Sequence, residues 1–293
     1  MDGALIIHKP AGVTSHDVVA RVRRICQERS VGHLGTLDPS ASGVLPLLLG
    51  RLTRLAQFFQ GRDKEYAGEI RFGWATDTYD AAGKPVGEIS SRQPTREEVE
   101  SALPRFRGRL QQVPPAYSAK KIDGVPAYKL ARREKPVTLA AVEVEVSQFD
   151  MTAMAGDRMR FHVTCSTGTY VRSLAHELGA ALGVGAHLSE LQRVRVGEFS
   201  LAASYTLDAL GELAAAGELD RALLPALRLL PEFPAVFAPA EAAGYLLQGR
   251  AANLGEFSQA PLVRVFTHDQ RLLAIARRLA GSLFQPQIVF PGA

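Results

Sequence analysis

The chain has 293 residues, 46% of them hydrophobic and 22% charged, which is enough for one large and one small domain core and excludes a disordered, collagenous or fibrous protein. No run of about 18 apolar residues occurs, and the opening MDGALIIHKP lacks the basic region and long apolar stretch of a signal peptide, so we expect no membrane span, no secretion and a cytoplasmic location. Cys26 and Cys165 form no CxxC pair, so neither a disulfide framework nor a zinc ribbon is predicted, and both are expected to be reduced and buried.

The first predicted elements are a helix and a strand. Residues 14–29 carry apolar residues at helical spacing with arginines opposite, and Thr14 or Ser15 can cap the first turn. Residues 66–72 alternate with strand periodicity, and Tyr66 would enter that strand.

The next predicted elements are a short helix and two strands. A capping box from Thr95 to Glu98 opens a helix that runs to about Leu103. Residues 142–149 alternate valines with polar residues, which predicts a half-solvated strand, and residues 158–165 predict another strand.

A polar turn follows that strand and leads into a helix with a continuous apolar stripe. Tyr170 and Arg172 fall at this junction between strand and helix, and Gly183 is the expected stop. Residues 206–230 also have a helical pattern.

The end of the chain predicts a small separate unit. The proline-rich PEFPAVFAP, residues 231–239, is interpreted as a linker, and residues 236–293 contain short strand-like runs. The runs are 262–266, 271–276 and 288–290. Because strands and helices are interspersed without regular alternation, the fold class is predicted to be α+β.

Positive charge is concentrated in residues 105–135. This segment has a net charge of +7, in a chain whose formal net charge is +4, so the rest of the chain is net negative. Its basic residues are Arg105, Arg107, Arg109, Lys120, Lys121, Lys129, Arg132, Arg133 and Lys135, against Asp123 and Glu134. Tyr117, Tyr128 and Phe106 interleave with these charges among turn-forming residues, which favours an extended surface loop that binds an RNA backbone and stacks on bases over a merely solvated face.

Two familiar motifs are incomplete. His176 and Glu177 begin an HExxH motif, but Ala180 stands where the second imidazole is needed, so no zinc site is predicted. Gly183 and Gly185 give half of a dinucleotide-binding motif, and they follow a helix instead of a strand.

The stretch GHLGTLDPSASGVLP, residues 32–46, predicts a turn followed by a strand, with one carboxylate and one imidazole among small residues. Pro39 disfavours a helical backbone at Asp38 and would hold this side chain in an extended pose. A sheltered functional carboxylate needs a cationic partner, and a bidentate guanidinium from Arg172 could supply it. The alternative is that Asp38 caps a turn, that Tyr66 is a core aromatic and that His33 is a packing residue.

Four sequence blocks in order resemble the TruB-type tRNA pseudouridine synthases, which isomerise uridine 55 in the T arm of tRNA. The blocks are GHLGTLDPSASGVLP, KEYAGEIRFGWATDTYDAAG, PPAYSAKKIDGVPAY and CSTGTYVRSLAHELG. The resemblance covers about residues 4–200. It implies a pseudouridine synthase catalytic domain over residues 1–230, with a mixed, mainly antiparallel central sheet flanked by helices and an inserted basic thumb at about 105–138. Position alone implies a β-rich, PUA-like RNA-binding domain over residues 236–293.

The resemblance implies three catalytic residues. Asp38 matches the essential aspartate, which acts on the sugar or on the base; the sequence leaves this choice open. Tyr66 matches the tyrosine that stacks on the uracil and is proposed to help remove the C5 proton, and Arg172 matches the arginine that pairs with the aspartate. Asp80 matches a second carboxylate partner of that arginine.

The resemblance also implies substrate-binding residues. His33 matches the side chain that takes the place of the extruded base, Tyr170 and Leu191 match walls of the pocket, and Lys9 matches a supporting lysine. His8 departs from the family, which usually has an acidic residue there beside the lysine. The remaining substrate-binding residues are Lys120 and Lys121, in the thumb that closes over the RNA.

The expected protein is therefore an isomerase, an intramolecular transferase that needs no cofactor or metal, acts as a monomer and binds the T stem-loop of tRNA. Two rival hypotheses remain. A nucleoside or glycoside hydrolase would use Asp38 and Asp80 as an acid and nucleophile pair and release free base. An RNA-binding module or tRNA folding chaperone would use only the basic segment, and Asp38 would be structural.

Overall fold

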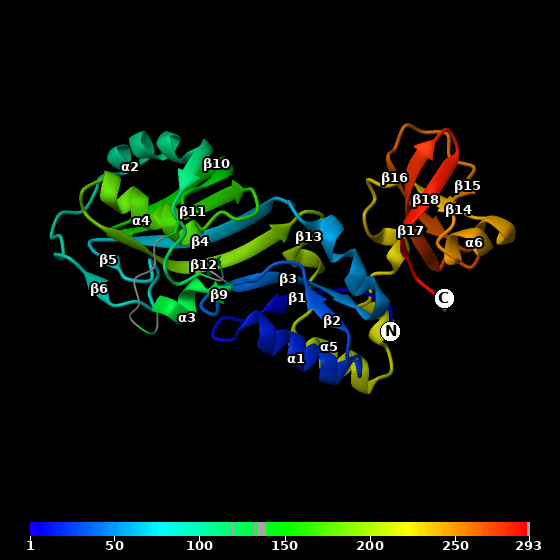
Figure 1. Ribbon diagram of the computed structural model, residues 1–293. Helices are drawn as coiled ribbons and strands as arrows, with labels where there is room; N and C mark the ends of the chain where they lie inside the picture. The colour runs from blue at the N-terminus through cyan, green and yellow to red at the C-terminus, as the bar shows by residue number, and fades with distance from the viewer. Residues whose placement is uncertain (119, 123, 132, 134–138, 292–293) are drawn as a thin grey trace.

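The computed structural model describes residues 1–118, 120–122, 124–131, 133 and 139–291. A nine-stranded mixed sheet forms its centre (Figure 1). In spatial order its strands are β1 (Gly3–Lys9), β3 (Ser42–Leu49), β12 (Ala186–Val196), β4 (Lys64–Phe72), β11 (Arg158–Cys165), β10 (Val142–Ala155) and β7 (Gly108–Gln112), with β2 (Val31–His33) paired to β3 and β13 (Phe199–Ser200) paired to β12. β3 and β12 are parallel and the other pairs are antiparallel, as the fold prediction required.

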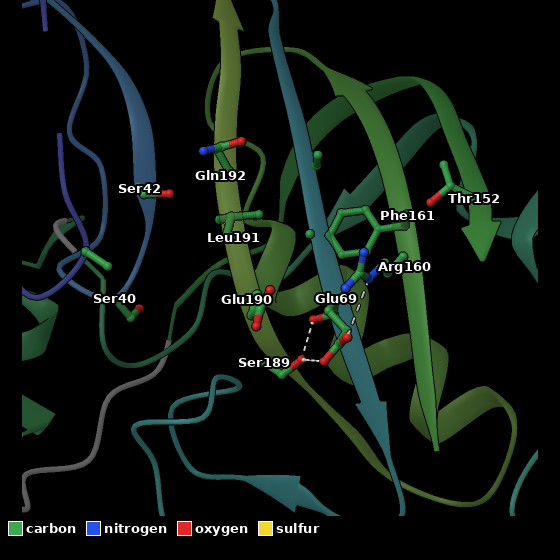
Figure 2. Close-up of a pocket in the computed structure, with 13 residues that line it drawn as sticks. Ser40, Ser42, Glu69, Thr152, Arg160, Phe161, Ser189, Glu190, Leu191 and Gln192 are labelled. Atoms are coloured by element: carbon green, nitrogen blue, oxygen red, sulfur yellow. Dashed lines mark hydrogen bonds and ion pairs between the residues drawn. The ribbon is translucent and has the colours of Figure 1, made fainter. Parts of the chain in front are cut away.

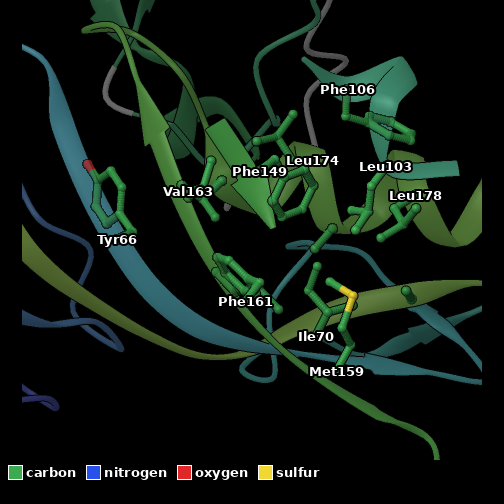
Figure 3. Packing of buried hydrophobic residues seen from close by; sticks show 14 of the residues in the cluster. Tyr66, Ile70, Leu103, Phe106, Phe149, Met159, Phe161, Val163, Leu174 and Leu178 are labelled. Carbon is green, nitrogen blue, oxygen red and sulfur yellow. The ribbon is translucent and has the colours of Figure 1, made fainter. Parts of the chain in front are cut away.

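Helices cover this sheet at both ends. α1 (Ser15–Ile25) and α5 (Leu207–Ala215) lie side by side against β1 and β3, and α2 (Arg96–Ala102) and α4 (Val171–Ala181) pack at the end formed by β4, β11 and β10 (Figure 1). The core beneath α2 and α4 joins side chains such as Phe149, Phe161 and Leu174, which Figure 3 shows packed together.

β3 is buried on both faces. Leu45 and Leu47 belong to the cluster under α1 and α5, whereas Val44 and Leu48 belong to a second cluster with the 3-10 helix Gly50–Phe59. A strand buried in this way is a nearly continuous apolar run, which stabilises the middle of the sheet but hides the alternation of its side chains.

Several predicted elements are confirmed. β11 has the predicted alternation of buried residues, and β4 has it at Tyr66, Ile70 and Phe72, although Glu69 of the predicted polar face is buried as well. The predicted cap at Thr14 and the predicted capping box at Thr95 are both formed. α4 ends before Gly183, which has a positive φ of 69°. Both cysteines are free and buried.

Other predictions were wrong in extent. The first helix ends at Ile25 instead of reaching residue 29, because Gln27 adopts a positive φ of 50°. Within 206–230, α5 stops at Ala215, where Gly217 takes a positive φ, and short 3-10 turns (Leu219–Arg221 and Ala226–Arg228) replace the rest of the expected helix.

The basic segment is not a loop throughout. β7 pairs with β10 inside the central sheet, and Phe106 is buried in the core beneath α2 instead of being free to stack on a base. Short elements follow: β8 (Lys121–Ile122), β9 (Val125–Pro126) and α3 (Ala127–Ala131). The predictions made for Asp123, Arg132, Glu134 and Lys135 lie outside the described residues, as does the side chain of Lys121.

The chain ends in a five-stranded sheet, seen apart from the central sheet in Figure 1. Its order is β14 (Ala235–Phe237), β16 (Leu262–Phe266), β17 (Leu272–Ala280), β18 (Leu283–Val289) and β15 (Ala252–Asn253), with α6 (Ala240–Leu247) beside it. β14 lies inside the predicted linker, so that prediction was wrong: Val236 is buried and the strand pairs in parallel with β16.

The last short elements are the strands β5 (Ala75–Thr76) and β6 (Pro85–Val86), which form a hairpin, and the 3-10 turns Leu103–Phe106 and Leu201–Ala203. In the part of the chain that the structure describes, no helix has the length and apolar character needed to cross a membrane.

Candidate active site

Hydrogen bonds from neighbouring segments hold the backbone on each side of Asp38. The Ser15 hydroxyl accepts a hydrogen bond from the Leu37 amide at 2.9 Å and donates to the Leu37 carbonyl at 3.1 Å. The Gly12 amide and the Lys9 ammonium both donate to the Pro39 carbonyl, at 2.8 and 3.3 Å. The residues on each side of Asp38 are therefore fixed.

Arg193 secures the same loop from β12. Its guanidinium is fully buried and donates to the carbonyls of Val44, Thr36 and Gly35, at 2.8, 3.2 and 3.1 Å. β3 and β12 approach closely here, because a Cβ atom added to Gly43 would stand 2.2 Å from the Arg193 carbonyl. Gly43 also has a φ of 112°, which side-chain-bearing residues rarely adopt.

The expected ion pair between Asp38 and Arg172 is present. Arg172 Nε lies 2.8 Å from Asp38 Oδ2, and the side chains are 5% and 38% exposed. The expected bidentate contact is absent, since among the described residues Arg172 makes no hydrogen bond to Asp38. Its Nη atoms donate instead to the carbonyls of Thr78 and Tyr117, at 3.0 and 3.1 Å. The carboxylate also makes none with the backbone of its own turn, so the turn-capping alternative has no support in this part of the chain.

Asp80 lies on the far side of Arg172. Its Oδ2 is 3.9 Å from Arg172 Nη1, while its Oδ1 accepts hydrogen bonds from the Thr78 hydroxyl and the Ala82 amide. Tyr79, which lies between Thr78 and Asp80 in the sequence, has a positive φ of 64°. Its ring stacks on His176 with the ring centroids 3.8 Å apart. Asp80 is buried, so it is not a solvated turn residue.

Lys9 is fully buried and satisfied by carbonyl groups. Its ammonium donates to Pro10, Val13 and Pro39, at 2.9, 2.7 and 3.3 Å. Burial lowers the pKa of Lys9 to about 8, against the opposing attraction of the Asp38 carboxylate. Lys9 thus has partners that do not depend on the acidic neighbour that His8 replaces.

Tyr66 stands in β4 at the edge of the core. It is buried in the cluster beneath α4, and Figure 3 shows its hydroxyl directed away from Phe161 and Val163. Its cross-strand partner is Arg193. Burial raises the pKa of Tyr66 to about 12, although the Arg193 guanidinium acts in the opposite direction. Tyr66 is thus a core aromatic and also a neighbour of Arg193, which bonds to the loop that carries Asp38.

His33 ends β2 and forms an edge-to-face pair with His16 of α1, with the ring centroids 6.3 Å apart. Its Nδ1 accepts a hydrogen bond from the Gly35 amide. Burial, together with the repulsion of His16 and Arg193, lowers the pKa of His33. A neutral imidazole is therefore favoured at neutral pH.

A cavity of about 580 Å³ opens beside the loop. Ser40, Ser42 and Leu191 line it, whereas Asp38, Tyr66 and Arg172 do not. Figure 2 shows the Ser189 hydroxyl hydrogen-bonded to Glu69 and Arg160 paired with the same carboxylate. Leu191 is thus a wall of a polar cavity that Ser40, two residues after Asp38, also lines.

Tyr170 and Lys120 are two further residues predicted to bind the substrate. Tyr170 directly precedes α4, and its backbone amide and carbonyl are both hydrogen-bonded to the side chain of Gln112. Lys120 is half-buried. Within the described ranges, no group of three or more His, Cys, Asp or Glu side chains gathers in a way that could hold a metal ion.

The sequence did not predict the roles of four further residues near the site, which are Arg193, Gln112, Ser15 and His16. The first three are buried polar side chains bonded mainly to backbone atoms, which leaves no motif in the sequence. For Ser15 a signal existed, because a hydroxyl at the start of a helix can bond to a neighbouring chain as well as cap the helix.

Comparison with known proteins assigns the family. The model of the TruB family pseudouridylate synthase N-terminal domain matches residues 23–171, and that of the tRNA pseudouridylate synthase B C-terminal domain matches residues 172–230. The tRNA pseudouridine synthase B of Solibacter usitatus is 47% identical over 292 residues, which are 99% of this chain and 100% of that one. The protein of the same name from Ectopseudomonas mendocina is 38% identical over 300 residues, with 100% and 97% covered.

A solved structure agrees with these matches. A chain in the structure of an H/ACA RNP bound to a substrate RNA containing 2'-deoxyuridine superposes with a TM-score of 0.72 and 25% identity, over 98% of this chain and 84% of that one. Sequence family and fold therefore lead to the same result. This chain belongs to the TruB family of pseudouridylate synthases.

Proposed function

We propose that this protein converts the uridine at position 55 in the T arm of tRNA into pseudouridine, with Asp38 as the essential catalytic group. The observation that carries the proposal is the pairing of a half-exposed Asp38 carboxylate with a buried Arg172 guanidinium, 2.8 Å apart. The names of the relatives, tRNA pseudouridine synthase B, support tRNA as the substrate.

The reaction breaks the bond between the ribose C1' and uracil N1 and forms a bond from C1' to C5. The C5 proton is lost and N1 gains a proton, so the product is an isomer and no oxidant or reductant is consumed. Arg172 places its guanidinium 2.8 Å from the Asp38 carboxylate, which is then positioned either to stabilise positive charge at C1' or to add to the base.

The target uridine must first leave the T loop. Flipping a base out of a structured loop costs a few kcal/mol, which stacking on an aromatic ring and filling of the vacated space can offset. Tyr66 would provide the ring and neutral His33 the filler, with His16 beside it. Leu191 and the adjoining cavity would accommodate the displaced nucleotide.

Replacing Asp38 with Asn tests the proposal. The substrate is an unmodified T-arm transcript that carries tritium at uridine C5, and the readouts are tritium release and mapping of the product. Asp38→Asn should lose turnover while RNA binding changes by less than about twofold. Asp208→Asn, which removes the same charge from an exposed site on α5, is the control and should match the wild type.

The outcomes separate the rival functions. Release of free uracil by the wild type would indicate a hydrolase. Tight binding of the transcript without any turnover by the wild type would indicate an RNA-binding module. Isomerisation retained in Asp38→Asn would refute the role of Asp38 while leaving the activity itself established.

The C-terminal sheet is proposed as a second RNA contact, of the PUA-like kind, over residues 236–293. Its arginines Arg250, Arg271 and Arg277 are exposed and can be reached by phosphate groups, although Arg271 also pairs with Asp269. Replacing all three with Gln should weaken binding of full-length tRNA more than binding of the isolated T arm; equal effects on both would contradict the proposal.

A further inference from the structure

The helix that carries Arg172 does not cap itself. Tyr170 occupies the N-cap position of α4 and its side chain makes no capping hydrogen bond. The amide of Gln112 bonds to the same residue instead: its Oε1 accepts from the Tyr170 amide at 2.7 Å, and its Nε2 donates to the Tyr170 carbonyl at 3.1 Å. Two hydrogen bonds in opposite directions therefore hold the main chain on both sides of Tyr170.

Gln112 cannot act on the substrate directly. It is 1% exposed, and both polar atoms of its side chain are used by the Tyr170 main chain. The Asp38 carboxylate, by contrast, is half-exposed. The geometry of the ion pair therefore depends on how the buried Arg172 side chain is placed. Arg172 lies two residues after Tyr170, whose main chain Gln112 holds.

The same stretch of chain makes further contacts with the start of α4. Gln112 is the last residue of β7, opposite Val142 of β10. Just after it, the Val113 carbonyl accepts from the Ser173 hydroxyl at 3.3 Å, and the Tyr117 carbonyl accepts from Arg172 Nη2 at 3.1 Å. The base of the inserted basic segment is thus bonded to the residues before, at and after Arg172.

We propose that Gln112 is a positioning residue for the isomerisation: by holding the Tyr170 peptide it sets the orientation of the Arg172 guanidinium toward Asp38. This inference rests on the proposed function. An error of about 1 Å in the placement of a catalytic group can lower a rate by about 100-fold, so losing this amide should affect the chemical step and not the binding of RNA.

The first test compares two neighbouring glutamines. Gln112→Met keeps the length of the side chain and removes both hydrogen bonds, and Gln111→Met makes the same change at the adjacent exposed position. Under single turnover on the T-arm transcript, Gln112→Met should react about 10- to 100-fold more slowly than Gln111→Met, with RNA Kd values within about twofold. Equal rates would overturn the proposal, even if the thermal stability of Gln112→Met is lower, because that pattern indicates a purely structural role.

The second test uses pH. In Gln112→Glu a neutral carboxyl can accept from the Tyr170 amide and donate to its carbonyl, as the glutamine does, whereas a carboxylate can only accept. Burial favours the neutral form, so it should be populated within reach of neutral pH. The rate of Gln112→Glu divided by that of the wild type should therefore rise as the pH is lowered from 8.5 to 6.

If Gln112→Met does not fold, the pH dependence of the rate ratio between Gln112→Glu and the wild type is the test by itself. A ratio that does not change with pH would overturn the proposal. Failure of the proposed function is distinguishable, because the wild type and Gln111→Met would then release no tritium either. With an active wild type, each result bears only on Gln112.

Discussion

Arg172 reaches Asp38 from a buried position, with Nε 2.8 Å from Oδ2, while its Nη1 lies 3.9 Å from Asp80 Oδ2. One guanidinium is therefore placed between a half-exposed carboxylate and a buried one. Each of its Nη atoms also donates to a backbone carbonyl, so the orientation of this cation is set by the chain around it and not by Asp38 alone.

Arg172→Met should abolish most of the activity without preventing binding of RNA. The substitution keeps much of the length but removes the charge that orients Asp38, and losses of about 100-fold or more are typical when an electrostatic partner of the reacting group is removed. Single-turnover tritium release and a binding titration would measure the two effects separately. Arg96→Met, on exposed α2, is the control, and a rate for Arg172→Met within threefold of this control would show that the ion pair is unnecessary.

Lys9 should make stability rise with pH above 8. Its pKa is about 8 in the folded protein and normal, near 10.5, in the unfolded chain, so between these values the unfolded chain binds one more proton. The free energy of unfolding should then increase by up to about 1.4 kcal/mol per pH unit from this group. Urea unfolding at pH 7.5, 8.5 and 9.5 would measure it.

Lys9→Met provides the control for this prediction. The buried Cys165 thiol and Tyr66 hydroxyl have raised pKa values and lower the stability at alkaline pH in both proteins, so they cancel in the difference between wild type and variant. If that difference does not change with pH, Lys9 keeps its proton in the folded state and the inferred effect of its burial is wrong.

Gly43→Ala should destabilise the protein by about 2–4 kcal/mol, because the new Cβ atom would press on the Arg193 backbone in addition to straining a left-handed residue. Gly12→Ala imposes a similar strain, at a φ of 87°, with nothing within 4 Å of the added atom, and should cost about 1–2 kcal/mol. Urea midpoints measure both. Equal losses would mean that β3 and β12 can separate without cost.

Binding of RNA should weaken steeply with salt. The logarithm of Kd plotted against the logarithm of salt concentration has a slope that grows by nearly one for each phosphate neutralised. Arg105→Gln and Arg109→Gln alter exposed residues of the basic segment and should each reduce the slope by about 1, whereas Arg107→Gln should reduce it less, because Arg107 pairs with Asp150. Identical slopes in all proteins would remove this segment from the RNA contact.

The sequence predicted best those elements with one buried face. β11 has the predicted bounds because Met159, Phe161, Val163 and Cys165 alternate with polar residues without interruption. β1, in contrast, is a run of consecutive buried residues and was missed, since a strand covered on both faces shows no alternation. β12 was missed because irregularities in its pairing at 188–190 and 193–195 break the period of two.

The candidate site divides in the same way. The ion pair could be anticipated because its two charged residues lie in recognisable blocks, at a turn and at a helix start. Arg193 and Gln112 could not, because they bond to backbone groups that every residue possesses, and only the fold brings those groups within reach. Phe106 was wrongly assigned to the surface because its charged neighbours concealed the apolar period that buries it.

The two sheets of the protein share one apolar cluster. Phe266 and Ile275 of the C-terminal sheet, with Phe290 just after it, pack with Leu52 and Phe59 of the 3-10 helix that follows β3. The side chains of Arg54 and Arg51 donate to the carbonyls of Val289 and Pro291. A chain truncated after residue 230 would therefore expose this apolar cluster to water and should tend to aggregate. The end of the chain thus stabilises the nine-stranded sheet by covering part of its core.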